Sequence, residues 1–191
     1  SENIAAGAFT DASSNSNTAA TEFSWTYNGT PASVSSVSLA SNNSTIAVTM
    51  DKAVYSTGGG SGALETTDFS LAISGGSASL SSATPSSISA SGNVYTLGIG
   101  ITGTPDGSEV VTVNPVSGSI YDAYGNISTN SQSNNTATLN DQLSPTVSIA
   151  AVSSGGDAVS SGATTNDASI ILALTTSEST TNLASADLTV S

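Results

Sequence analysis

The stretch Ser119–Pro145 reads SIYDAYGNISTNSQSNNTATLNDQLSP and contains, in a fixed order, the signals from which the rest of the chain is built. An apolar and an aromatic residue lead into Asp122-Ala123-Tyr124-Gly125-Asn126. A polar run follows, then a short strand-like piece that ends at Leu139, and then a proline. Asp, Gly and Asn favour a turn, and the flanking pieces favour strands. The stretch is therefore predicted to be the turn and final strand that close a β-domain.

The same order of residues occurs at the start of the chain. Ala8-Phe9 leads into Asp11-Ala12-Ser13-Ser14-Asn15, and a polar run, the aromatic stretch Phe23–Tyr27 and Pro31 follow. Asp and Asn are four residues apart in both copies, and the two Asp residues are 111 positions apart. A motif that recurs at the length of a domain indicates a tandem array.

Short stretches with alternating apolar residues lie between and after these two copies. Thr45–Met50, for example, places Ile46, Val48 and Met50 on one face and smaller or hydroxyl-bearing residues on the other. This period of two is typical of half-buried strands, and no helical periodicity accompanies it. Further alternating sets are Phe23, Trp25 and Tyr27; Phe69, Leu71 and Ile73; and Tyr95, Leu97, Ile99 and Ile101. The prediction is an all-β chain of tandem β-sandwich domains.

Three domain pieces are predicted. Residues 1–31 form the C-terminal strands of one domain, residues 32–142 form a complete sandwich, and residues 143–191 form the N-terminal strands of the next. In the third piece strands are expected at Val147 and Ile149, at Ile170, Leu172 and Leu174, and from Leu188 to Val190. Two explanations fit the incomplete pieces: a longer array, or completion by strands of neighbouring copies.

The composition excludes several classes of function. The chain has 14 acidic residues, one basic residue, no His and no Cys, and its net charge is −13. Binding to nucleic acids requires Lys and Arg against the phosphates, so no nucleic-acid partner is expected. No apolar run is long enough for insertion into a membrane. Without His or Cys, a Ser-His-Asp triad, a Cys nucleophile and a His-based metal site are all impossible, and we expect no enzyme.

The strand patterns resemble the bacterial Ig-like repeats of large surface adhesins and S-layer-type proteins. The resemblance is carried by Thr45–Val54, by Thr67-Asp68-Phe69, by Asn93–Leu97 and by Ile120–Asn126. The pieces Ala6–Asp11 and Thr165–Ile170 look like the end and the beginning of a related type. The resemblance implies tandem Ig-like sandwiches, an extracellular location at the bacterial cell surface and an architectural role without catalytic residues.

Calcium is the only cofactor for which candidate ligands stand out, and none is required. The candidates are the carboxylates and amides of Asp11, Asn15, Asp122, Asn126 and Asp141, since oxygen ligands suit this cation. The alternative is that each Asp caps its own turn. Lys52, the only basic residue, is expected to pair with Asp51 on the surface; the alternative is an isopeptide bond to an Asn.

The sequence therefore predicts a structural repeat unit of a cell-surface stalk or of a self-assembling extracellular filament. Other copies of the chain, arranged head to tail, are the expected partners. Two alternatives stay open. One is an adhesin module for a glycan or surface ligand, with an aromatic-lined patch near Trp25 or Tyr124. The other is an accessory domain of a secreted hydrolase.

Overall fold

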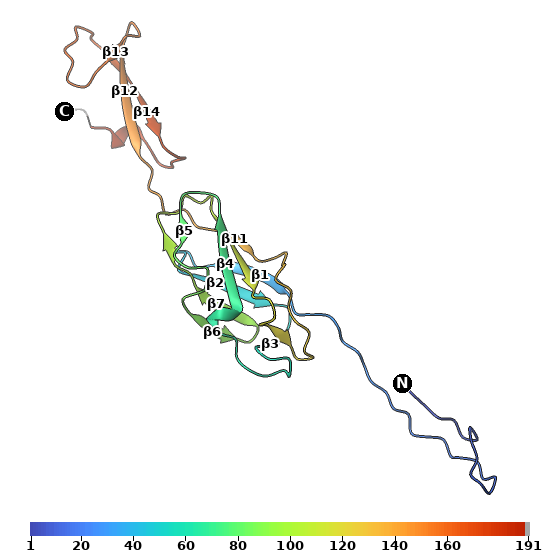
Figure 1. The fold of residues 1–191 in the computed structure, drawn as a ribbon. Helices are drawn as coiled ribbons and strands as arrows, with labels where there is room; N and C mark the ends of the chain where they lie inside the picture. The colour runs from blue at the N-terminus through green and yellow to red at the C-terminus, as the bar shows by residue number, and fades with distance from the viewer. Residues whose placement is uncertain (190–191) are drawn as a thin grey trace.

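The computed structural model describes residues 1–189 and shows an extended chain of three parts (Figure 1). A narrow N-terminal arm, residues 1–27, leads through a first link, residues 28–31, to a central sandwich. A second link, residues 140–146, leads to a smaller C-terminal sheet. The arm and this sheet lie at opposite ends of the molecule. The fold is all-β and of the sandwich type, as predicted. Val190, one of the residues expected in a strand, lies outside the described residues.

Two antiparallel sheets form the central sandwich. One has the strand order β1-β2-β7-β6 and the other has the order β11-β9-β4, while β10-β3 and β5-β8 are small additional pairs. The strand bounds are β1 (Val34–Leu39), β2 (Thr45–Met50), β3 (Val54–Tyr55), β4 (Phe69–Ser74), β5 (Ser79–Leu80), β6 (Ile88–Ser91), β7 (Val94–Gly98), β8 (Ile101–Thr102), β9 (Val110–Pro115), β10 (Tyr121–Asp122) and β11 (Thr136–Thr138). A single 3₁₀ turn, η1 (Thr66–Asp68), precedes β4.

The alternating residues form the core between the sheets. Ile46, Val48 and Met50 of β2 are buried, and the residues between them are only half-buried. Phe69 of β4 meets Tyr95 of β7 with ring centroids 6.0 Å apart, in a tilted arrangement that suits aromatic pairs. The connected core consists of residues from Ala32 to Leu139. The domain boundaries 1–31, 32–142 and 143–191 remain a prediction.

Two sequence-based expectations about strands need correction. The alternating piece Tyr95–Ile101 is divided between β7 and β8, with Ile99 and Gly100 at the break. Phe23–Tyr27 forms no strand, and only Phe23 makes a bridge, to Glu2. All three of its aromatic side chains are exposed. A strand needs a neighbour for its backbone groups, and the arm folds back only on itself.

The C-terminal sheet has the order β13-β12-β14. Its strands are β12 (Val147–Ser153), β13 (Ala158–Val159) and β14 (Ile170–Thr176), and a second 3₁₀ turn, η2 (Ser185–Asp187), follows them. The expected strands at Val147 and Ile170 are therefore present. Leu188, where a further strand was expected to begin, comes directly after η2 and lies in no strand. Most of the aliphatic side chains of this sheet are exposed: Val147, Ile149, Ile170, Ile171 and Leu172. Within residues 1–189 there is no helix with the length and apolarity needed to cross a membrane.

Candidate functional site

The turn Asp122–Asn126 is closed by the side chains of its first and last residues. The Asp122 Oδ1 atom accepts the backbone N–H groups of Tyr124 and Asn126, each at 2.9 Å. Its Oδ2 atom accepts the amide N–H of Asn126, also at 2.9 Å. Gly125 occupies the left-handed region with φ 84°. This is an Asx turn, in which both carboxylate oxygens already receive hydrogen-bond donors.

The environment of Asp122 keeps its carboxylate ionised. The side chain is only 1% exposed. Burial raises the pKa, but the hydrogen bonds from Asn126 and Tyr124 and the charge of Lys52 outweigh it and hold the pKa below the ordinary value. The carboxylate is therefore stabilised by hydrogen-bond donors of the chain itself, which is the arrangement expected of a structural turn.

The same turn recurs in the N-terminal arm, residue for residue. Asp11 accepts the backbone N–H groups of Ser13 and Asn15 and the side-chain amide of Asn15, each at 2.9 Å. Ser14 has φ 72°, although this left-handed conformation usually favours Gly. The N–H of Asn17 donates to the Phe9 carbonyl at 2.9 Å, as the N–H of Ser128 does to Ile120 at 2.8 Å.

The two copies differ in their surroundings. Ile120, which precedes the turn in the central sandwich, is fully buried, whereas its counterpart Phe9 is 61% exposed. The hydrogen bonds within the turn therefore form without a sandwich around them. What the arm lacks is the apolar environment that covers Ile120.

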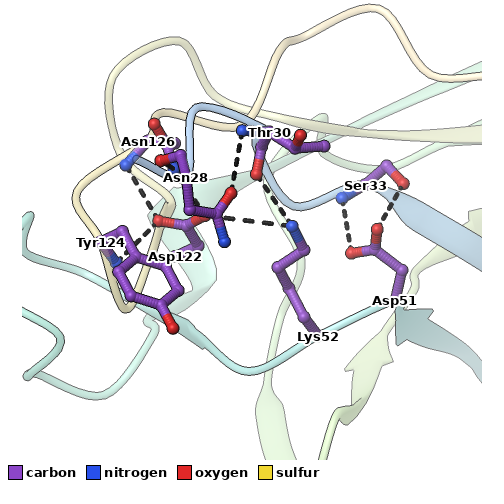
Figure 2. Close-up of polar contacts among 8 residues, drawn as sticks. All are labelled: Asn28, Thr30, Ser33, Asp51, Lys52, Asp122, Tyr124 and Asn126. Carbon is purple, nitrogen blue, oxygen red and sulfur yellow. Dashed lines mark hydrogen bonds and ion pairs between the residues drawn. The ribbon is translucent and has the colours of Figure 1, made fainter. Parts of the chain in front are cut away.

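Lys52 and the Asp122 turn hold the link between the arm and the central sandwich (Figure 2). The Lys52 Nζ atom donates to the Thr30 carbonyl at 2.8 Å and lies 4.0 Å from Asp122 Oδ2. The side-chain amide of Asn126 donates to the Asn28 carbonyl at 3.0 Å. These contacts bind two carbonyls of one short link, and we call Lys52, Asp122 and Asn126 the clasp.

The expected partner of Lys52 was wrong. Asp51 instead accepts the backbone N–H of Ser33 at 2.9 Å and its hydroxyl at 3.1 Å. Asp51 and Lys52 lie in a bend between β2 and β3, and their side chains engage different groups (Figure 2). The nearest carboxylate to Lys52 is therefore 70 positions away in the chain rather than adjacent.

Asp141 lies at the second link, apart from both turns in the chain. Its Oδ1 atom accepts the backbone N–H of Leu143 at 2.8 Å. Its carboxylate also neighbours Glu178 of the C-terminal part. Burial, and then the proximity of Asp141, raise the pKa of Glu178.

The start of the C-terminal part repeats the start of the central sandwich. In the central sandwich the backbone N–H of Asp51 donates to the carbonyl of Ser33 at 2.9 Å. In the C-terminal part the backbone N–H of Ser177 donates to the carbonyl of Thr146, also at 2.9 Å. In the return direction, the N–H of Ser33 donates to Asp51 and the N–H of Thr146 donates to the Ser177 hydroxyl. Lys52 follows Asp51 in the chain, and Glu178 follows Ser177 at the equivalent position. The second link thus has an acid where the first has the only base.

The equivalence continues through the two 3₁₀ turns. Asp68 Oδ2 accepts the backbone N–H of Glu65 at 2.7 Å, and Asp187 Oδ2 accepts that of Ala184 at 2.9 Å. The two segments share their first and last residues: Leu64-Glu65-Thr66-Thr67-Asp68 corresponds to Leu183-Ala184-Ser185-Ala186-Asp187. Leu64 is buried in the core, whereas Leu183 is 51% exposed.

An open cleft of about 450 Å³ lies at this part of the C-terminal region. Its lining includes Val147 from β12, the segment Ser179–Leu183 and Asp187 from η2. In the central sandwich the corresponding space is occupied. There β10 pairs with β3, and the hydroxyl of Ser119 donates to the Asp68 carbonyl at 3.2 Å.

Sequence reasoning missed the most deeply buried acid of the chain. Glu109 is fully buried. Its Oε1 atom accepts the backbone N–H groups of Ser77 and Ala78, and its Oε2 atom accepts that of Asp106. The partners lie in two different loops, so no local motif identifies this residue. Glu178 could have been identified from the sequence as the counterpart of Lys52, because each lies two residues after the end of a strand, β14 and β2 respectively.

No family model, no curated protein and no solved structure matches the chain. Among residues 1–189, no three or more acidic side chains gather into a group that could hold a metal ion. The five candidate calcium ligands lie in three separate places, two Asx turns and the second link. Calcium binding therefore stays a prediction. Thermal melting with calcium or with chelator, at matched ionic strength, tests it, and an unchanged midpoint would contradict it.

Proposed function

We propose that the chain is a structural repeat unit of a bacterial cell-surface stalk or of a self-assembling extracellular filament, built from Ig-like modules. The observation that carries this proposal is the double equivalence around the central sandwich. The arm repeats the hydrogen bonds of the turn that closes the sandwich. The C-terminal part repeats those that open it. Both repetitions support an array in which one module follows another along the chain.

The links support a mechanical role. The first link is held by the clasp, through Lys52 and Asn126. The second is held by Asn43 and Asn140, since the Asn43 amide donates to the Asn140 carbonyl at 2.7 Å and the Asn140 N–H returns a bond at 2.9 Å. Side chains that bind link carbonyls restrict the angle between neighbouring parts. An array of such modules resists bending at each link.

Immunogold electron microscopy tests the proposal on cells that make the full-length protein. Antibodies against the central sandwich are expected to label material that projects from the intact cell surface. Label confined to the cell interior of permeabilised cells would contradict the proposal. Glycan-array binding that is lost on Trp25→Ala or Tyr124→Ala would instead favour the adhesin module.

A further inference from the structure

The first link contains Asn28-Gly29, the only place in the chain where Gly follows an Asn. Because Gly has no Cβ, the backbone nitrogen of Gly29 is open to approach by the side chain before it. We infer that Asn28 is a site of spontaneous covalent modification, in which its side-chain amide is lost as ammonia and replaced by a carboxylate, and that the clasp controls the rate. This inference goes beyond the proposed function and does not depend on it.

The reaction consumes only water, and Asn is among the thermolabile residues of proteins. The Gly29 nitrogen forms a bond to the Cγ atom of Asn28 while the bond from Cγ to the amide nitrogen breaks. The proton of the Gly29 N–H leaves with that amide as ammonia, and a five-membered imide remains. Water then opens the imide. If water breaks the new bond, the product is Asp; if it breaks the original peptide bond, the chain continues through the side chain as isoaspartate.

The local structure of the link favours the first step. The N–H of Thr30 donates to the Asn28 Oδ1 atom at 3.1 Å. This bond folds the Asn28 side chain over the following peptide group, and it polarises the carbonyl that the Gly29 nitrogen attacks. Asn28, Gly29 and Thr30 are all exposed, so water has access to the imide.

Exposure is a property of both links. Residues 28–30 are exposed although a complete sandwich follows them, and residues 140–146 are all exposed although a complete sandwich precedes them. A complete module on either side of a link therefore leaves the link open to water.

The clasp opposes the same step (Figure 2). The side-chain amide of Asn126 donates to the Asn28 carbonyl at 3.0 Å, and Lys52 Nζ donates to the Thr30 carbonyl at 2.8 Å. The Asn28 carbonyl belongs to the same peptide group as the attacking Gly29 nitrogen. That nitrogen cannot turn toward Cγ until the bond from Asn126 opens, so the fraction of molecules with an open clasp sets the rate.

The products alter the clasp itself. Either product adds one negative charge to a chain whose net charge is −13. In isoaspartate the main-chain carbonyl that Asn126 binds becomes a free carboxylate, and the backbone of the link becomes one carbon atom longer. Conversion therefore changes both the length of the link and the acceptor that the clasp holds.

Mass spectrometry of the whole chain during incubation at pH 8 and 37 °C tests the inference. The incubated chain is denatured and cut with trypsin at Lys52, so that Asn28 lies in fragment 1–52 and Asn130, an exposed Asn before Ser131, lies in fragment 53–191. Fragment 1–52 is expected to gain about 1 Da, assigned to residue 28 by fragment ions, while the other fragment keeps its mass. A gain at Asn28 that is no faster than at Asn130 would overturn the inference.

Two variants check the chemistry. Asn28→Gln lengthens the side chain, which disfavours the five-membered ring, and should abolish the gain in mass. Gly29→Ala is expected to slow the reaction by at least about tenfold. A Cβ at this position meets the ring of Tyr27, which is exposed and can move aside, so the sandwich stays folded. A rate unchanged by Gly29→Ala would contradict attack by this nitrogen.

Asn126→Ala tests the control by the clasp. Loss of the bond to the Asn28 carbonyl should raise the rate by about two- to tenfold, the range of one hydrogen bond. Asn15→Ala removes the equivalent amide from the turn of the arm and is the matched control, and circular dichroism checks that the sandwich stays folded. The parent should also react faster in urea than in buffer, and in urea as fast as Asn126→Ala. Equal rates of the parent in buffer and in urea would overturn control by the clasp.

Discussion

Asp11 and Asp122 form identical turns, but only Asp122 is buried beside a core. We expect Asp122→Ala to destabilise the central sandwich by about 1–3 kcal/mol, because two backbone N–H groups and the Asn126 amide lose their acceptor. Urea denaturation followed by circular dichroism measures this loss. The matched change Asp11→Ala removes the same bonds from the exposed arm and should leave the sandwich transition unchanged. Equal losses from the two variants would contradict the distinction.

Glu109 should make the central sandwich sensitive to acid. The N–H of Ala78 above all, with those of Glu109 itself and Asp106, holds the pKa of Glu109 below its ordinary value, against burial and the charge of Asp106, which raise it. A lowered pKa means that this stabilisation is present above the pKa of the unfolded chain and is lost as the pH falls through the folded pKa. Thermal melting from pH 6 to pH 2 should therefore show a steep fall in the midpoint.

Glu109→Gln is the test of that assignment. The amide keeps one acceptor but presents N–H groups to a backbone donor, so the variant should melt several degrees lower than the parent at pH 7. Its midpoint should also fall less as the pH is lowered, since one titrating group has been removed. A variant with the same pH profile as the parent would show that other carboxylates control acid unfolding.

At the scale of elements, the clasp should control how the arm is held. Lys52→Met removes the bond to the Thr30 carbonyl and the ion pair with Asp122 while it keeps the aliphatic stem. We expect less than about 1 kcal/mol of lost sandwich stability, because the lysine is partly exposed. Small-angle X-ray scattering should nevertheless show a broader distribution of overall dimensions. An unchanged scattering profile would mean that the link is rigid without Lys52, and Asp157→Asn serves as the control.

The strands that sequence predicts well are those with one buried face. Ile46, Val48 and Met50 alternate because one face of β2 lies against the other sheet, and this burial is what periodicity reports. β6 was missed because Ile88 is its only large apolar residue and the strand lies at the sheet edge. Phe23–Tyr27 alternates as strongly as β2 but has no sheet to join. Alternation thus predicts a face that can be buried, and the neighbours decide whether a strand forms.

The candidate site was predictable only in its local part. Asp122 and Asn126 are four residues apart, so the Asx turn follows from sequence spacing alone. The partners of the clasp are far apart in the chain, and Lys52 and Asp122 meet only because β3 pairs with β10. A carboxylate such as Glu109, whose donors come from two separate loops, gives no local signal at all.

At the scale of the whole molecule, charge should oppose association between copies. Each chain carries a net charge of −13, so two copies repel one another at low ionic strength. The Debye length shortens from about 30 Å at 0.01 M salt to about 10 Å at 0.1 M, and association should therefore strengthen as salt is added. Sedimentation velocity in 10, 100 and 500 mM NaCl measures this trend. Association that weakens with salt would mean that charge attraction, and not apolar contact, joins the copies.

Because Lys52 is the only basic residue, trypsin has one cleavage site in the chain, and that site lies in the clasp. A protease must draw the surrounding backbone into its own active site, which requires the clasp to open first. When opening is fast relative to cutting, the cleavage rate reports the fraction of molecules with an open clasp. One cut there separates β1 and β2 from the rest of the sandwich. The closed clasp therefore protects the entire chain against proteases that cleave after basic residues.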